Sequence, residues 1–223
     1  MSHASDEPRL SRYPIQLPLL YWRKSPARTR AGAGWTQELS EEGATVELAE
    51  RLEPQMLLRV RIQTNRGPIE MEAKVVWIGA PAPPSAGHHH GLAFTQIAPD
   101  QLQALQDLLL PLSMIVHIGM RVPVDLAVTC REKSPGGLLL RGRAGDVSRG
   151  GLLLRLREAI APGSMVEITL HAATGPITLE GAIMWAQPPE RRKSGELIDH
   201  GLRFTSSTWS VSLALGFLLA EPR

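Results

Sequence analysis

Residues 145–154, GDVSRGGLLL, place an acid, a hydroxyl and two glycines directly before a leucine run. The carboxylate of Asp146 can accept hydrogen bonds, and the hydroxyl of Ser148 can donate or accept them. Gly151 has no Cβ, so the backbone there permits close approach. Earlier in the chain, Arg121 supplies a guanidinium that can grip phosphate oxygens through two bonds or pair with a guanine edge. These four residues are candidates for a binding site.

The same residues also have a purely structural interpretation. Asp and Ser side chains commonly bond nearby backbone N–H groups in turns, and glycine readily adopts positive φ. Arg121 precedes a predicted strand, where a solvated surface arginine is ordinary. The residue types alone therefore leave turn chemistry and ligand binding open.

An internal repeat shows which elements must position these residues. RYPIQLPL at residues 12–19 matches RVPVDLAV at 121–128, and ELSEEGATVEL at 38–48 matches DVSRGGLLLRL at 146–156. The GPI segments at 67–69 and 175–177 and the tryptophans Trp77 and Trp185 repeat at the same spacing of 108 residues. HGLAF at 90–94 returns as HGLRF at 200–204, 110 residues later, after loops of different length. Two copies of one fold are therefore predicted.

The periodicity within each copy indicates strands followed by a helix. Residues 56–64 and 164–172 alternate apolar and polar side chains, and turn signals separate about six such segments per copy. Residues 99–112 have leucines at helical spacing between two prolines, and the second copy ends in the more apolar STWSVSLALGFLLA. We predict a mainly β protein of two tandem six-stranded antiparallel β-barrels, each followed by a C-terminal α-helix; a small sandwich is the alternative. Each helix is expected to pack on its own barrel or on the neighbouring copy, and an exposed apolar stripe would serve a possible homodimer.

The two arginine-bearing segments and the two serine-glycine turns resemble the PilZ family, small bacterial barrels that are chiefly receptors for the second messenger cyclic di-GMP. The resemblance covers nearly the whole chain and implies an N-terminal domain at residues 9–112, a connector at 113–120 and a C-terminal domain at 121–223. The family motif [D/N]xSxxG is complete at Asp146, Ser148 and Gly151. The family motif RxxxR is partial, because Arg121 matches its second arginine and His117 stands where the first is expected.

The first copy departs further from both motifs. Arg12 matches the second arginine, but Pro8 stands four residues before it. The turn reads Glu38, Ser40 and Gly43, so glutamate replaces the shorter acid. The resemblance therefore implies a degenerate first domain and a second domain that binds cyclic di-GMP.

The ligand implied by the resemblance has two phosphates and two guanines. Asp146 can accept from the guanine N1 and N2 donors, and Arg121 can contact either a phosphate or a guanine edge. The expected ligand-binding residues are Arg121, Asp146, Ser148, Gly151, His117 and Arg149. Replacing a phosphate-binding arginine by His117 removes roughly 1.5–3 kcal/mol, or about ten- to a hundredfold in affinity. Arg141, Arg143 and Arg149 lie near the turn in sequence and either compensate for this loss or keep the surface soluble.

Composition and motif searches exclude several other classes. The net charge is only +2, which is weak for a nucleic-acid binder, and Cys130 is the only cysteine, so neither an intramolecular disulfide nor a thiolate metal cluster can form. The chain has no apolar run long enough for a membrane span or a signal core, and a cytoplasmic location is expected. No catalytic motif appears, His88, His89 and His90 lack further metal ligands nearby, and residues 23–32 are interpreted as a solvated loop.

The sequence thus predicts a non-enzymatic bacterial signalling protein without a metal or cofactor. Its second domain is expected to bind cyclic di-GMP and to regulate an unidentified protein partner. The resemblance implies motility, pili or exopolysaccharide as outputs. The alternative is a tandem PilZ adaptor that has lost the ligand and acts through protein contacts alone. His90 and His200 precede equivalent glycines and are expected to serve the barrels rather than catalysis.

Overall fold

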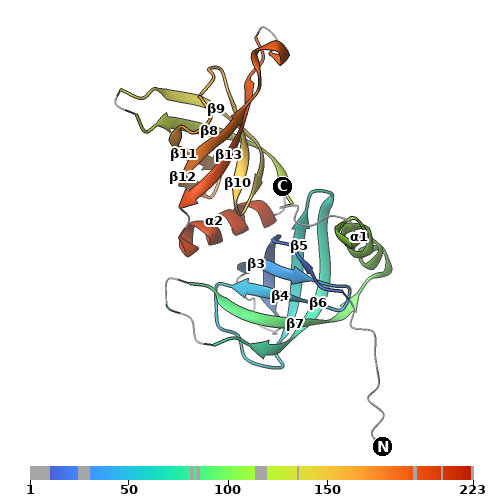
Figure 1. The fold of residues 1–223 in the computed structure, drawn as a ribbon. Helices are drawn as coiled ribbons and strands as arrows, with labels where there is room; N and C mark the ends of the chain where they lie inside the picture. The colour runs from blue at the N-terminus through green and yellow to red at the C-terminus, as the bar shows by residue number, and fades with distance from the viewer. Residues whose placement is uncertain are drawn as a thin grey trace, which may run out of the picture.

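The chain forms two closed six-stranded antiparallel β-barrels, each followed by a helix (Figure 1). The computed structural model describes residues 11–24, 31–80, 83, 86–113, 120–134, 136–192, 195–206 and 208–221. Closure of both sheets confirms the predicted barrels and excludes the sandwich. Each barrel encloses its own cluster of buried apolar side chains.

The first barrel runs from β1 to β7. Its six main strands close because β4 pairs with both β3 and β7, while the short β1 extends the edge beside β3. The strands are β1 (Tyr13–Pro14), β2 (Pro18–Arg23), β3 (Gly32–Leu39), β4 (Gly43–Leu48), β5 (Leu57–Thr64), β6 (Gly67–Ile78) and β7 (His88–Ile97).

The second barrel repeats this order with one long strand in place of β1 and β2. That strand, β8, passes a β-bulge between Pro123 and Leu126, which corresponds to the break between β1 and β2. The strands are β8 (Val122–Glu132), β9 (Leu139–Ser148), β10 (Gly151–Leu156), β11 (Met165–Ala172), β12 (Gly175–Ala186) and β13 (Ile198–Ser206). A short 3₁₀ turn, η2 (Pro189–Arg191), follows β12.

The repeat extends to backbone irregularities. The long strands β6 and β12 each carry two register shifts at corresponding places. In each barrel a tryptophan ring covers a glycine on the next strand: a Cβ at Gly91 would lie 1.9 Å from Nε1 of Trp77, and a Cβ at Gly201 would lie 2.0 Å from Nε1 of Trp185. The two copies therefore share these backbone irregularities.

One equivalent pair differs in residue type and yields a prediction. Gln55 has a φ of 66°, whereas its counterpart Gly163 has a φ of 90°. The backbone amide of Gln55 donates to a carbonyl on β6, and that of Gly163 donates to a carbonyl on β12. A non-glycine residue in the left-handed region costs roughly 1–2 kcal/mol of stability. Glycine avoids this cost, but its greater flexibility in the unfolded chain costs roughly 0.5–1 kcal/mol. Gln55→Gly should therefore raise the free energy of unfolding by up to about 1 kcal/mol in urea titrations. Gly163→Gln is the reciprocal variant and should lower it; a destabilising Gln55→Gly contradicts the interpretation.

The first helix packs on its own barrel. The predicted helix is α1 (Pro99–Leu109), and the last predicted residues form a 3₁₀ turn, η1 (Leu110–Ser113), around Pro111. Leu105, Leu108 and Leu109 are buried in the first core. The amphipathic pattern thus reflects a helix with one covered face.

The second helix, α2 (Trp209–Ala220), lies between the barrels (Figure 1). It contacts β12 of its own barrel and β2, β3 and β5 of the first barrel. Leu215 and Leu219 are buried in the second core, while Ala220 packs with Leu20 and Ala33 of the first barrel. The residues of α2 are mostly apolar on all of its faces because the helix is covered on both sides. Within the described residues, no helix combines the length and apolar character that a membrane crossing requires.

Two equivalent histidines are fully buried in the barrels. Nε2 of His90 accepts from the backbone N–H of Leu52 at 3.1 Å, and Nε2 of His200 accepts from that of Ile160 at 3.1 Å. Their Nδ1 atoms lie 2.9 Å from the carbonyls of His88 and Ile198, so the proton of the neutral ring resides on Nδ1. The structural role expected for both histidines is confirmed.

Candidate functional site

The candidate site lies at the hairpin between β9 and β10. Ser148 ends β9, Gly151 begins β10, and Oγ of Ser148 donates to the carbonyl of Gly151 at 3.2 Å. In the first barrel Ser40 donates to the carbonyl of Gly43 at 3.1 Å and also lies 3.2 Å from its amide. The motif serine therefore closes the same turn in both barrels.

The motif glycine is explained by the closure of the barrel. A Cβ at Gly151 would lie 2.2 Å from the carbonyl oxygen of Leu202, and a Cβ at Gly43 would lie 2.2 Å from that of Leu92. These contacts are with the backbone of the neighbouring strand, which cannot move aside easily. The close approach that Gly151 permits is thus first of all between strands, and the fold requires it whether or not a ligand binds.

Asp146 is the motif residue that remains available on the surface. Pro123 pairs with Asp146 across β8 and β9, and NH1 of Arg121 donates to Oδ1 of Asp146 at 2.9 Å. Their side chains are 40% and 29% exposed. An ion pair with this exposure stabilises the fold by only about 0–1 kcal/mol, so a ligand can replace it at small cost. The structure therefore brings together the guanidinium and the carboxylate that the sequence singled out.

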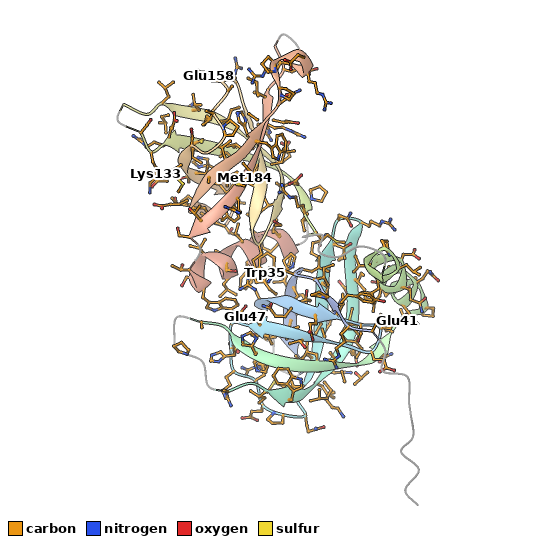
Figure 2. The ribbon with its side chains drawn as sticks, viewed as in Figure 1. Trp35, Glu41, Glu47, Lys133, Glu158 and Met184 are labelled. Atoms are coloured by element: carbon orange, nitrogen blue, oxygen red, sulfur yellow. The ribbon has the colours of Figure 1, made fainter. Side chains whose placement is uncertain are left out.

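Arg149, in the same turn, contacts the first barrel. Its NH2 donates to Oε2 of Glu47 on β4 at 2.7 Å, and its side chain is only 20% exposed. Its guanidinium lies 5.7 Å from the ring centre of Trp35 and 5.8 Å from that of Trp209. Figure 2 shows Trp35 and Glu47 on the side of the first barrel that faces α2. Arg149 thus joins the barrels through an ion pair with Glu47 and a cation–π contact with Trp35, and its second cation–π contact is with Trp209 of α2.

The corresponding site in the first barrel is more acidic. NH1 of Arg12 lies 3.5 Å from Oγ1 of Thr45, which in turn donates to Glu38 at 3.3 Å. An open groove of about 1070 Å³ lies beside this site, and its lining includes Arg12, Ser40, Glu41, Glu42 and Gly43. An excess of carboxylates there disfavours a phosphate-bearing ligand.

A comparison with protein families identifies the fold that carries these two sites. The PilZ domain model matches residues 11–110 and 120–209. The chain belongs to the PilZ family. Both barrels are PilZ domains, and the second match ends where α2 begins.

Solved structures of other PilZ proteins are similar to this chain. PlzA from Borreliella burgdorferi, in complex with c-di-GMP, is 12% identical with a TM-score of 0.37, and the match covers 94% of each chain. MrkH from K. pneumonia is 11% identical with a TM-score of 0.39, covering 92% of this chain and 84% of that one. The PilZ domain of YcgR from Escherichia coli, with c-di-GMP, is 17% identical with a TM-score of 0.38, covering 48% and 91%. No curated protein matches the chain.

The structure distributes the expected site residues of the second PilZ domain unevenly. Arg121 and Asp146 converge, Ser148 and Gly151 shape the turn beside them, and Arg149 is engaged with the first PilZ domain. His117 lies outside the described residues. Sequence reasoning missed the role of Trp35, which aligns with Arg143 in the repeat. A tryptophan facing outward from a barrel strand was the available signal for a covered surface.

No metal centre accompanies this site in the residues that the structure describes, because they contain no group of three or more His, Cys, Asp or Glu side chains arranged to hold an ion. Burial and the nearby Glu132 raise the pKa of the Cys130 thiol to about 12, so this buried cysteine stays protonated near neutral pH.

Proposed function

We propose that this protein is a non-enzymatic cyclic di-GMP receptor whose second PilZ domain binds the dinucleotide and regulates a protein partner. Membership of the PilZ family supports the ligand class. The observation that carries the proposal is the contact between Arg121 and Asp146 beside a complete [D/N]xSxxG turn. Motility, pili or exopolysaccharide production are the outputs that family membership suggests.

Each proposed contact follows from the chemistry of the exposed groups. On binding, Asp146 exchanges the guanidinium of Arg121 for the N1 and N2 donors of a guanine. Arg121 is then free to contact a phosphate or the O6 and N7 edge of a base. Ser148 and Gly151 contribute by holding the turn, and the hydroxyl of Ser148 can also bond the ligand. His117 is the proposed counterpart of the first motif arginine.

Calorimetric titration of the intact protein with cyclic di-GMP tests the proposal. We expect saturable binding that Arg121→Ala and Asp146→Ala each weaken by about ten- to a hundredfold, because each loses a charge-assisted hydrogen bond. Arg12→Ala and Glu38→Ala remove the equivalent side chains of the first domain and should leave the affinity unchanged. The absence of any binding heat up to high micromolar ligand overturns the proposal.

The alternative function is a tandem PilZ scaffold without a nucleotide ligand. One observation favours it: Arg149 of the motif is held by Glu47 and two tryptophans at the contact between domains. In that case the two barrels and α2 form one rigid platform for a protein partner. The same titration separates the two functions, because a scaffold gives no saturable heat with cyclic di-GMP.

A further inference from the structure

Two arginines face each other on the outer surface of the second barrel. Arg143 on β9 is paired in register with Arg155 on β10, and the two side chains are 47% and 45% exposed. Like charges directly opposite on neighbouring strands destabilise a sheet. A surface that retains such a pair gains stability when an anion lies between or above the two groups.

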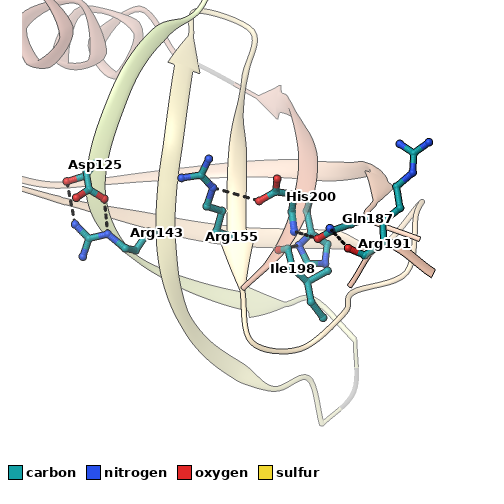
Figure 3. Close-up of polar contacts among 8 residues, drawn as sticks. Asp125, Arg143, Arg155, Gln187, Arg191, Ile198 and His200 are labelled. Atoms are coloured by element: carbon teal, nitrogen blue, oxygen red, sulfur yellow. Dashed lines mark hydrogen bonds and ion pairs between the residues drawn. The ribbon is translucent and has the colours of Figure 1, made fainter. Parts of the chain in front are cut away.

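Each arginine bonds a carboxylate on the strand that flanks the β9–β10 pair. Nε of Arg143 donates to Oδ1 of Asp125, and its NH2 donates to the carbonyl of the same residue at 3.3 Å. Nε of Arg155 donates to Oδ1 of Asp199 at 3.2 Å. Figure 3 shows Asp125, Arg143 and Arg155 side by side across the strands. Because both ion pairs are exposed, each contributes little to stability and can be exchanged for another anion.

This arginine pair adjoins the site described above. The pairing of β9 with β10 shifts register next to Gly145, so that Leu153 faces Asp146 and Leu154 faces Ala144. A Cβ at Gly145 would lie 2.9 Å from Cζ of Arg155. The guanidinium of Arg155 therefore rests on the bare backbone of the residue that precedes Asp146. The next residue along β9, Asp146, bonds Arg121.

The same surface of the first domain is already a contact surface. In the repeat, Trp35 and Glu47 stand where Arg143 and Arg155 stand in the second domain. Trp35 donates from Nε1 to the carbonyl of Ser212 in α2 at 2.8 Å, and Glu47 accepts from Arg149. One barrel thus uses this face to hold a cation and a helix. The other presents two half-exposed guanidinium groups at the equivalent positions.

We propose that Arg143 and Arg155 form the phosphate-binding part of the cyclic di-GMP site in the second PilZ domain. They supply cationic contacts at a site where His117 replaces one arginine of the family motif. Two guanidinium forks about one strand spacing apart, ~5 Å, suit a ligand that carries two phosphates. The phosphates take the places of Asp125 and Asp199 beside the two guanidinium groups, while Asp146 holds a guanine. This inference rests on the proposed function.

Titration of variants of the full chain with cyclic di-GMP tests the inference. Arg143→Ala and Arg155→Ala should each weaken binding by about tenfold or more. Arg131→Ala is the matched control: it removes an exposed arginine from β8, eight residues beyond the partner of Asp146, or about 26 Å along the strand, and should leave the affinity unchanged. Asp199→Asn removes the carboxylate that competes for Arg155 and should tighten binding several-fold.

Thermal melts of each variant verify folding, since both arginines are exposed and their loss should leave the barrel intact. If the wild type binds and Arg121→Ala weakens it, while Arg143→Ala and Arg155→Ala match Arg131→Ala, the arginine pair is not part of the site although the proposed function stands. If the wild type does not bind, the proposed function and this inference both fail. Weakened binding by Asp199→Asn also contradicts the inference.

Discussion

Trp35→Ala is expected to lower the free energy of unfolding by about 3–5 kcal/mol, the usual cost of removing a fully buried tryptophan. Trp35 belongs to the first domain but packs in the core cluster of the second, and its Nε1 bonds the backbone of α2. Its loss therefore removes apolar contact, one hydrogen bond and one of the two rings beside Arg149. Chemical denaturation followed by tryptophan fluorescence and circular dichroism measures the effect.

Trp77→Ala is the matched control for this prediction. Trp77 is 41% exposed and covers Gly91 of its own barrel, so the same substitution should cost less. The contact between domains should also loosen in Trp35→Ala alone, with two separable unfolding transitions where the wild type has one. Equal losses for the two variants, with a single transition in both, refute the proposed role of Trp35.

Stability should fall as the pH drops below about 6.5, because two buried histidines must then gain protons on unfolding. Burial lowers the pKa of His90 and of His200 below the ordinary 6.5, because a charged ring in the barrel would lose its hydration. Each neutral Nε2 also accepts a hydrogen bond from a backbone N–H. The stability linked to the neutral rings is complete above the unfolded pKa and is lost as the pH falls toward the folded pKa. The slope should reach up to about 1.4 kcal/mol per pH unit for each histidine.

Urea titrations between pH 5 and 8 measure this slope, a range in which most carboxylates remain ionised. His90→Gln and His200→Gln should each reduce the slope by about half, even where the variants are less stable overall. His171→Gln is the control, because His171 is exposed and bonds the hydroxyl of Thr129 on the surface. A free energy of unfolding that stays constant across the range contradicts the prediction.

Much of the fold was predictable because the chain carries two copies of the same pattern. Strand periodicity places β5 and β11 within one residue of their observed starts, and the repeat fixes the equivalence of Trp77 with Trp185. The helix ending at Leu109 is shorter than expected because its last turn tightens ahead of Pro111. Local signals suffice for these elements because each is determined by side-chain alternation, prolines and turn residues.

The candidate site was predictable only in part. The proximity of Arg121 and Asp146 follows from the pairing of β8 with β9. Arg121 lies two residues before Pro123, and Pro123 is the strand partner of Asp146. The direction of Arg149 did not follow, since it depends on Glu47 and Trp35, which lie more than a hundred residues earlier in the chain. The guanidinium of Arg155 lies against Gly145, the residue before Asp146, at a register shift that the residue pattern does not indicate.

The placement of α2 has a consequence for biosynthesis. The first barrel can close once β7 has left the ribosome, but Leu20, Ala33 and Trp35 stay uncovered until residues 209–220 follow. At ordinary translation rates that interval is on the order of ten seconds, long enough for a nascent chain to meet chaperones or other nascent chains. Slow or interrupted synthesis of the second half should therefore promote aggregation of the first.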